Sequence, residues 1–145
     1  MNKNNYIFYP IRTSAILTGS FVAGTILGGG HSKVINGAIG TPSSNNHLEL
    51  YVNFTKGSLT SATIKVEFSN DGSTWYQETE DNLAITTGVI TEVPVTRVFT
   101  ATGNYRVPIN INSPWINANW IRISALGTGT ATGSLLQIDA VLGNV

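Results

Sequence analysis

A strict alternation of apolar and polar positions identifies the strands of this chain. Within residues 61–77, Ile64, Val66 and Phe68 occupy every second position with polar residues between them, the pattern of a half-buried antiparallel strand. The same alternation begins at His47 and continues through the next seven residues. Both segments predict strands that turn one face to a core and leave the other to solvent or a neighbour.

A tight turn joins the strand before residue 70 to a second strand, so residues 61–77 predict a complete β-hairpin. Asn70, Asp71 and Gly72 tolerate the positive φ that tight hairpin turns require. With Trp75 they resemble the Asp-box of sialidases and related propeller proteins, which braces a hairpin. The spacing departs from that box by one residue, and the box occurs once. We therefore expect these four residues to form a structural turn and not a glycoside-cleaving site.

Two further alternating segments, residues 120–126 and 135–142, lie close to the end of the chain. We expect them to pair as a hairpin across the Gly- and Thr-rich turn at residues 127–133. The apolar positions expected to point inward are Ile121, Ile123, Ala125, Leu136, Ile138, Ala140 and Leu142.

The remaining segments are less regular. Residues 14–28 fit either a short helix or two strands, and their Gly and Thr content favours strands. Residues 32–46 predict a long loop that holds one short strand. Residues 80–82 predict an acidic turn, and residues 89–100 a longer β-rich stretch in which Pro94 requires an edge position or a bulge.

The spacing of these elements predicts the fold class. About eight strands, with turn signals at intervals of about 8 to 12 residues, are typical of an all-β fold, here an antiparallel, jelly-roll-like β-sandwich. The length of 145 residues fits a single domain. We expect residues 1–12 to form an N-terminal arm that adds a strand to a neighbouring subunit, and residues 13–145 to form the sandwich.

Low charge narrows the range of partners. Only 11% of the residues are charged and the formal net charge is zero, against roughly 25% charged residues in an average globular chain. We therefore expect neither nucleic acid nor membrane as a partner, and a neutral surface that tends to associate. The apolar stretch at residues 15–30 is interrupted too often to span a membrane. No signal peptide is expected from the polar N-terminal residues.

No set of residues predicts catalysis, a metal or a cofactor. The chain has no cysteine, which excludes disulfides and thiolate ligands. Glu49 and Glu67 are able to face each other across two strands, but we favour a solvated or interface position for both. His31 and His47 have no third ligand at a metal-like spacing. Glu78, Glu80 and Asp81 lack the spacing of a calcium loop, and a solvated turn is the expectation for them. We expect a protein that is not an enzyme.

Aromatic and apolar side chains are the better functional candidates. They are able to anchor protein interfaces, and aromatic rings also stack on sugar rings. For an interface, the candidates are Tyr6, Phe8, Tyr9, Ile11, Trp115 and Trp120. For a sugar platform, the alternative, they are Trp75, Tyr76, Trp115 and Trp120.

Residues 47–78, HLELYVNFTKGSLTSATIKVEFSNDGSTWYQE, resemble a pattern met in small β-sandwich structural proteins of tailed bacteriophages. The resemblance implies a virion protein made in the host cytoplasm, such as a capsid decoration or cement subunit or a head-fibre module. Its partners would be the major capsid protein or other virion proteins. Such families act as symmetric homo-oligomers, often trimers. The alternative function is a carbohydrate- or receptor-binding module of a virion fibre.

Overall fold

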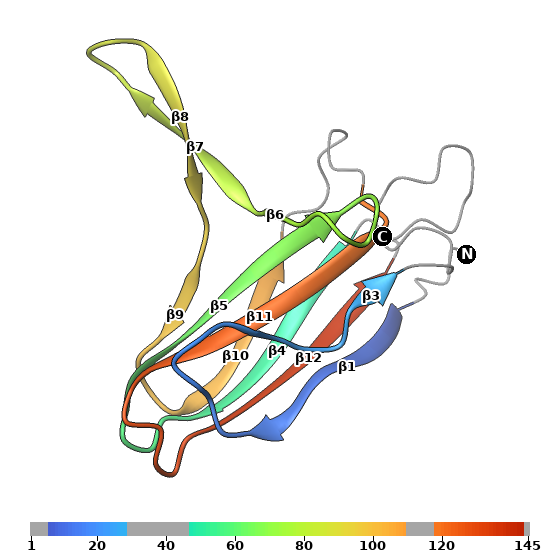
Figure 1. Ribbon diagram of the computed structural model, residues 1–145, viewed down its shortest axis with the longest axis vertical. Coiled ribbons are helices and arrows are strands. Elements are labelled where there is room, and N and C mark those ends of the chain that lie inside the picture. Colours follow the sequence, from blue (N-terminus) through green and yellow to red (C-terminus); the bar gives the residue numbers. More distant parts are fainter. Residues whose placement is uncertain (1–5, 29–46, 110–117, 144–145) are drawn as a thin grey trace.

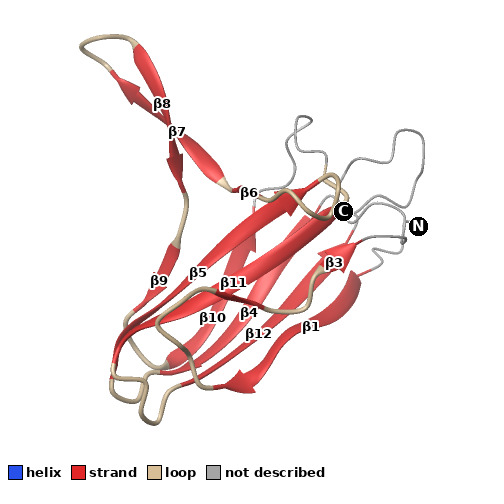
Figure 2. Ribbon diagram, viewed as in Figure 1, coloured by secondary structure: helices blue, strands red, loops and turns tan. Residues whose placement is uncertain are grey.

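A computed structural model describes residues 6–28, 47–109 and 118–143 of the chain. These residues form strands and connecting turns without a helix (Figures 1 and 2). The strands are β1 (Tyr6–Ala15), β2 (Val22–Ala23), β3 (Leu27–Gly28), β4 (His47–Thr55), β5 (Leu59–Ser69), β6 (Tyr76–Gln77), β7 (Thr79–Ala84), β8 (Val89–Pro94), β9 (Arg97–Phe99), β10 (Gly103–Ile109), β11 (Trp120–Gly129) and β12 (Leu135–Gly143).

Two antiparallel sheets face each other. The first has the order β1-β12-β4-β10, and the second has the order β2-β11-β5-β6, with β3 also on β11 and β9 also on β5. β2 and β3 share one edge position and β6 and β9 share the other, so the two sheets together have the eight positions of a jelly roll. The predicted all-β, jelly-roll-like sandwich is confirmed, with twelve strands in the described residues in place of about eight.

The core lies between the two sheets and follows the alternation in the sequence. Alternate residues of β4, β5, β11 and β12 point inward, and most of them are almost fully buried, because successive side chains of a strand point to opposite faces. The largest fully buried side chains are Leu17, Leu48, Leu50, Phe54, Ile64, Ile121, Ile123, Leu136, Ile138 and Leu142. The predicted hairpin at residues 61–77 is confirmed, since β6 pairs with the end of β5.

The predicted pairing of residues 120–126 with residues 135–142 is wrong. β11 pairs with β5, β2 and β3 in the second sheet, whereas β12 pairs with β1 and β4 in the first. The turn between them crosses from one sheet to the other. The inward residues were nevertheless predicted correctly, because the apolar faces of both strands meet in the same core.

Residues 79–94 also differ from the prediction. The expected acidic turn at residues 80–82 lies within β7, and the expected stretch at residues 89–100 divides into β8 and β9. β7 and β8 pair over their whole length and form a hairpin that extends away from the sandwich, which we call the projecting hairpin (Figure 1). Pro94 ends β8, where no ladder hydrogen bond is required of it.

Residues 14–28 contain two short strands, β2 and β3, as their composition favoured. The loop predicted at residues 32–46 lies outside the described residues. The segment interpreted as an N-terminal arm is part of β1 from Tyr6 onward, and it pairs with β12 of the same chain. It is therefore an edge strand of the sandwich. Where the chain is described, there is no helix of the length and apolarity that crossing a membrane requires.

Candidate interaction surfaces

The outer face of the second sheet carries a chain of charged and aromatic contacts around Glu67. The Arg122 guanidinium donates through Nε and Nη2 to the Glu67 carboxylate at 2.8 and 3.1 Å. It also lies 4.5 Å from the centre of the Trp75 ring, within cation–π distance. Lys65 Nζ donates to Glu67 at 3.3 Å and lies 4.7 Å from the centre of the Phe21 ring. We call these five residues the Glu67 cluster.

Opposite charges hold the Glu67 cluster together. The hydrogen bond from Arg122 lowers the pKa of Glu67, burial opposes that change, and Lys65 adds to the lowering. The pKa of Arg122 is raised in turn, chiefly by its hydrogen bond to Glu67. A carboxylate held ionised by two cations is a poor general acid, so the cluster is suited to fixing the positions of Trp75 and Phe21.

The turn after β5 is built around the Asp71 carboxylate. Its Oδ1 accepts hydrogen bonds from the backbone N–H groups of Thr74 and Ser73 at 2.7 and 2.8 Å, and Ser69 Oγ donates to the same oxygen. The donors on Thr74, followed by those on Ser73 and Ser69, lower the pKa of Asp71. These are the bonds that a structural turn requires, and they occupy the carboxylate.

Trp120 lies on the inner side of this turn. A Cβ built at Gly72 would lie 3.3 Å from the Trp120 ring. The indole is half-buried, and Trp120 pairs with Ser69 in the ladder between β11 and β5. Trp120, predicted as an interface residue, therefore packs against the turn of its own chain.

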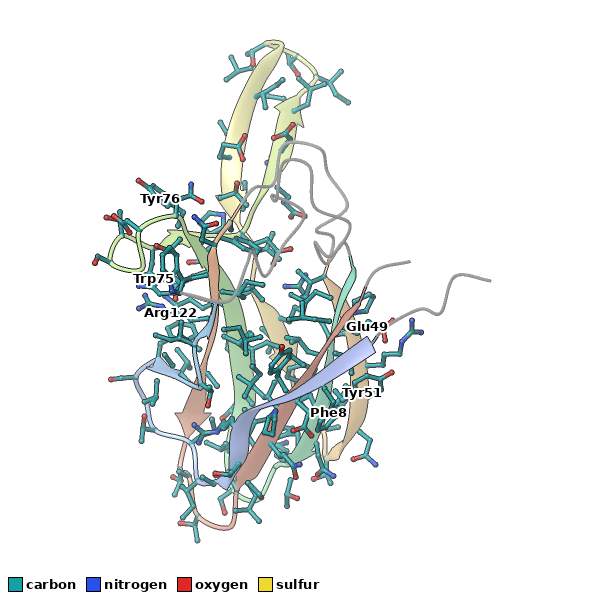
Figure 3. All side chains as sticks on the ribbon, turned by 90° about the vertical axis from the view of Figure 1, so that its right-hand side faces the viewer. Phe8, Glu49, Tyr51, Trp75, Tyr76 and Arg122 are labelled. Atoms are coloured by element: carbon teal, nitrogen blue, oxygen red, sulfur yellow. The ribbon has the colours of Figure 1, made fainter. Side chains whose placement is uncertain are left out.

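The outer face of the first sheet has its own ion pair, on the opposite side of the molecule from the Glu67 cluster (Figure 3). Arg106 Nε donates to Glu49 at 2.9 Å, and the Tyr51 hydroxyl donates to the same carboxylate at 3.1 Å. Glu49 and Glu67 therefore do not face each other, contrary to the arrangement considered from the sequence. Each is paired with an arginine of its own sheet.

An open depression of about 410 Å³ lies beside Tyr51 on this face. Hydrogen-bonding and aromatic side chains surround it. Its lining is Tyr51, Val52, Asn53, Asn104, Tyr105, Arg106, Gln137 and Asp139. Aromatic rings next to amide and carboxylate groups are the combination that binds sugars.

Three interactions tie the base of the projecting hairpin to the sandwich. Val95 N–H donates to the Glu78 carbonyl at 2.8 Å, and Gln77 Nε2 donates to the Val95 carbonyl at 3.0 Å. The Arg97 guanidinium binds both oxygens of the Glu78 carboxylate at 2.7 and 3.1 Å. A bidentate pair of this kind fixes direction as well as distance, so the hairpin leaves the second sheet at a defined angle.

Beyond this base the projecting hairpin has no contact with a core. Every residue of β7 and β8 is exposed, and Ile85 at the tip exposes 93% of its surface. Asp81 and Glu92 face each other across the two strands. A hydrogen bond to Glu92 and the charge of Glu92 raise the pKa of Asp81, while a hydrogen bond from Thr79 lowers the pKa of Glu92.

The remaining predicted interface residues have different positions. Phe8 exposes 59% of its surface on β1, and Tyr9 is half-buried. Ile11 is only 2% exposed and belongs to the core, so it offers no surface to a partner. Tyr6 is the first residue of β1, and Trp115 lies outside the described residues.

Sequence reasoning missed the projecting hairpin. Its local signal is the Thr-Thr-Gly sequence at residues 86–88 between two apolar pairs, which marks a turn. The turn was instead expected at residues 80–82, because Glu80 and Asp81 are acidic and Asn82 favours turns. Within the described ranges, no group of three His, Cys, Asp or Glu side chains is placed to hold a metal ion.

The fold defines the class of this protein as a jelly-roll sandwich with an inserted hairpin. No protein-family model matches the chain, and no curated protein sequence matches it. A comparison with solved structures finds similarity to the SPBc2 prophage-derived protein YomS. The alignment covers 99% of this chain and 97% of that one, with 12% sequence identity and a TM-score of 0.49.

Proposed function

We propose that this chain is a non-enzymatic structural protein of a bacteriophage virion. In this proposal it is a decoration or cement subunit, which binds the capsid surface and bridges neighbouring subunits. The proposal draws its phage context from the resemblance of residues 47–78 to phage β-sandwich proteins. Jelly rolls serve many functions, including those of viral capsid proteins and lectins, so the choice depends on the surfaces.

The projecting hairpin is the observation that carries the proposal. It places large apolar side chains in solvent at the end of a fixed arm. Exposed apolar surface of this kind marks an interaction site, because covering it with a partner is energetically favourable. The low overall charge reduces the cost of removing water when the surfaces meet. The affinity for the partner would therefore come mainly from the apolar surface that the contact buries, and not from ion pairs.

Four of the carboxylates support a role without catalysis. Glu49, Glu67 and Glu78 each bind an arginine of the same chain, and Asp71 is held by the donors of its turn. A pair of carboxylates for hydrolysis needs one group that stays protonated near neutral pH. The contacts of Glu67 and Asp71 instead lower the pKa of each carboxylate.

The test is co-sedimentation of the purified chain with tailed-phage capsids assembled without it. The expected result is saturable binding at a fixed ratio of chain to capsid subunit. A matched pair of variants tests whether the apolar face of the hairpin is needed for binding, directly or through bridging of neighbouring subunits: Leu83→Asp removes an apolar group of that face, and Thr86→Asp adds the same charge at the turn. The proposal expects the first to bind more weakly than the second. A chain that stays in the supernatant at every capsid concentration would overturn the proposal.

The depression beside Tyr51 favours a second candidate, a carbohydrate- or receptor-binding module of a virion fibre. Tyr51 is exposed there beside Asn53 and Asn104, which supply neutral donors and acceptors. The same protein preparation is therefore titrated with glycans while its intrinsic fluorescence is followed. A saturable response that Tyr51→Ala abolishes, without capsid binding, would favour this candidate over the first.

A further inference from the structure

We propose that the projecting hairpin of one copy docks on the edge of a second copy around Arg12, which joins copies head to tail into a closed homo-oligomer. This inference deepens the proposed function, because it names the partner that covers the hairpin. The inference is tested without capsids, so the inference and the proposed function can fail separately.

Charge is divided between the hairpin and the rest of the chain. The chain has eight basic and eight acidic residues, and their formal charges cancel. Three of the acidic residues, Glu80, Asp81 and Glu92, lie in the projecting hairpin, which has no lysine or arginine. The hairpin therefore carries a formal charge of −3 and the remainder of the chain +3. A hairpin that meets the body of another copy brings opposite charges together.

The exposed apolar side chains of the hairpin would also be stabilised by contact with a partner. An isolated two-stranded hairpin is marginally stable in water, because it has no third strand or second layer to bury its apolar groups. The register places Leu83 and Ile90 opposite each other, two positions from the Asp81–Glu92 pair and on the same face. This face, with Ile85 at the tip, presents an apolar end followed by two carboxylates. Its complement is an apolar surface beside a cation.

Arg12 provides that complement. Of the six basic residues that the structure describes, four contact a carboxylate: Lys65, Arg97, Arg106 and Arg122. The other two are Lys56, in the turn between β4 and β5, and Arg12, on the edge strand β1. The Arg12 guanidinium instead donates to backbone carbonyls, at 3.2 Å to Leu136 and at 2.8 Å to Ile16. Burial lowers the pKa of Arg12, as expected for a cation that has lost water without gaining a carboxylate.

The surroundings of Arg12 are open, and exposed apolar residues lie there beside two threonines, Thr13 and Thr25. Ile16, whose carbonyl accepts one of the Arg12 bonds, exposes 59% of its surface, and Leu135 is also exposed. An open depression of about 340 Å³ lies beside Arg12, between β1 and the segment of β2. Its lining includes Pro10, Ala15 and Ala23. The edge around Arg12 therefore has a cation for the two carboxylates of the hairpin, exposed apolar groups for its apolar end, and an open depression that leaves room for it.

A hairpin does not reach this edge of its own chain. Figure 1 shows the hairpin leaving the sandwich beyond β6, whereas β1 lies on the other side of the molecule. The contact therefore joins different surfaces of two copies. Contacts of this heterologous kind close into a ring when the rotation between copies permits.

The experiment measures the mass of the full chain by sedimentation equilibrium over a range of concentrations, with no capsid present. We expect a closed oligomer. Asp81→Lys should weaken its association at least about tenfold, because a buried charge pair becomes a repulsion. Glu80→Lys makes the same change of charge on the adjacent residue, whose side chain lies on the other face of the hairpin, and should change association less than about twofold.

Charge-swapped variants test whether the edge around Arg12 is the surface that binds the hairpin. Arg12→Glu should weaken association as Asp81→Lys does, and the two changes in one chain should restore it. Circular dichroism first checks that Arg12→Glu is folded, since the side chain also binds carbonyls of its own chain. If it is not, Ile16→Asp replaces it, with Thr13→Asp on the same strand as the control. Equal effects of Asp81→Lys and Glu80→Lys, or no rescue by the combined changes, would overturn the inference.

A deletion gives an independent outcome. The backbone groups of Glu78 and Val95 are hydrogen-bonded, so an Asn-Gly turn in place of residues 79–94 can close the base of the hairpin. The shortened chain should be a folded monomer. An oligomer that persists after this deletion, or a full-length chain that is monomeric at its highest soluble concentration, would overturn the inference. Capsid binding by a full-length chain that is monomeric in solution would leave the proposed function standing.

Discussion

Single carboxylates on the second sheet are held ionised by the donors around them. Glu67 is bound by Arg122 and Lys65, and Asp71 accepts from two backbone amides and two hydroxyl groups. Their pKa values are lowered, so both stabilise the folded chain above their ordinary pKa, and that contribution is lost as the pH falls through the folded pKa. Protonation of these two carboxylates in acid should therefore destabilise the protein.

We predict that Glu67→Gln lowers the free energy of unfolding by about 1 to 3 kcal/mol at neutral pH, since it removes the charge that satisfies a partly buried guanidinium. The difference from the unmodified protein should shrink as the pH falls below the ordinary pKa of glutamate, because acid protonates Glu67 and removes the same interaction. Urea unfolding at several pH values measures it.

Glu80→Gln is the control for this prediction. It removes the same charge from an exposed position on the projecting hairpin. We expect Glu80→Gln to change the free energy of unfolding by less than about 0.5 kcal/mol at any pH. A Glu67→Gln difference that stays constant from neutral pH to pH 3 would contradict the proposed role of the Glu67 charge.

At the scale of elements, two turns connect the sheets and pack on each other. The β4–β5 turn and the β11–β12 turn both cross between the sheets at the same end of the sandwich (Figure 1). Ser58 N–H donates to the Thr132 carbonyl at 2.9 Å. Gly57 has a φ of +56°, and a Cβ there would lie 2.5 Å from both the Gly133 carbonyl carbon and the Thr132 oxygen. This contact requires glycine.

We predict that Gly57→Ala costs about 1 to 3 kcal/mol of stability, because the side chain must be placed against backbone in a strained conformation. Gly88→Ala is the matched control. Its φ of +68° is similar, but a Cβ there meets nothing within 4 Å. Urea unfolding should show the larger loss for Gly57→Ala. Equal losses would mean that the backbone conformation alone, and not the contact between turns, requires glycine.

At the scale of the whole molecule, stability should be uneven. The central strands β4, β5, β11 and β12 each pair on both sides and contribute most of the core. The projecting hairpin has two strands and no buried side chain among its described residues. The sandwich should therefore unfold as one unit, with the hairpin opening separately.

We predict the slowest amide exchange in the central strands and the fastest among the paired strands in β7 and β8, at concentrations where the chain is monomeric. Hydrogen–deuterium exchange followed by mass spectrometry measures this order. Exchange in the hairpin should slow as the concentration rises, because a second copy then covers it. Hairpin amides as protected as those of β5 in the monomer would contradict this prediction.

Much of the fold could be predicted from the sequence, and the errors have a common cause. Faces were predicted well, as at Ile64, Ile123 and Ile138, since the alternation is a local property of each strand. The strand pairing was predicted correctly for the hairpin at residues 61–77 and wrongly for residues 120–142, because a hairpin connection and a crossover between sheets use the same turn residues. The structure also places two of the candidate residues. Asp71 proved to be the centre of its turn, whereas Ile11 is buried in the core.

The sequence by itself determined which residues face the core, because the period of two depends only on the geometry of an extended chain. It also determined the low charge and its division between residues 79–94 and the rest. Only the tertiary structure decided that Glu67 meets Arg122, 55 residues away, and that Glu49 meets Arg106, 57 residues away. It also decided that residues 79–94 leave the sandwich. Such contacts depend on which strands become neighbours, and that choice is made by the packing of the whole chain.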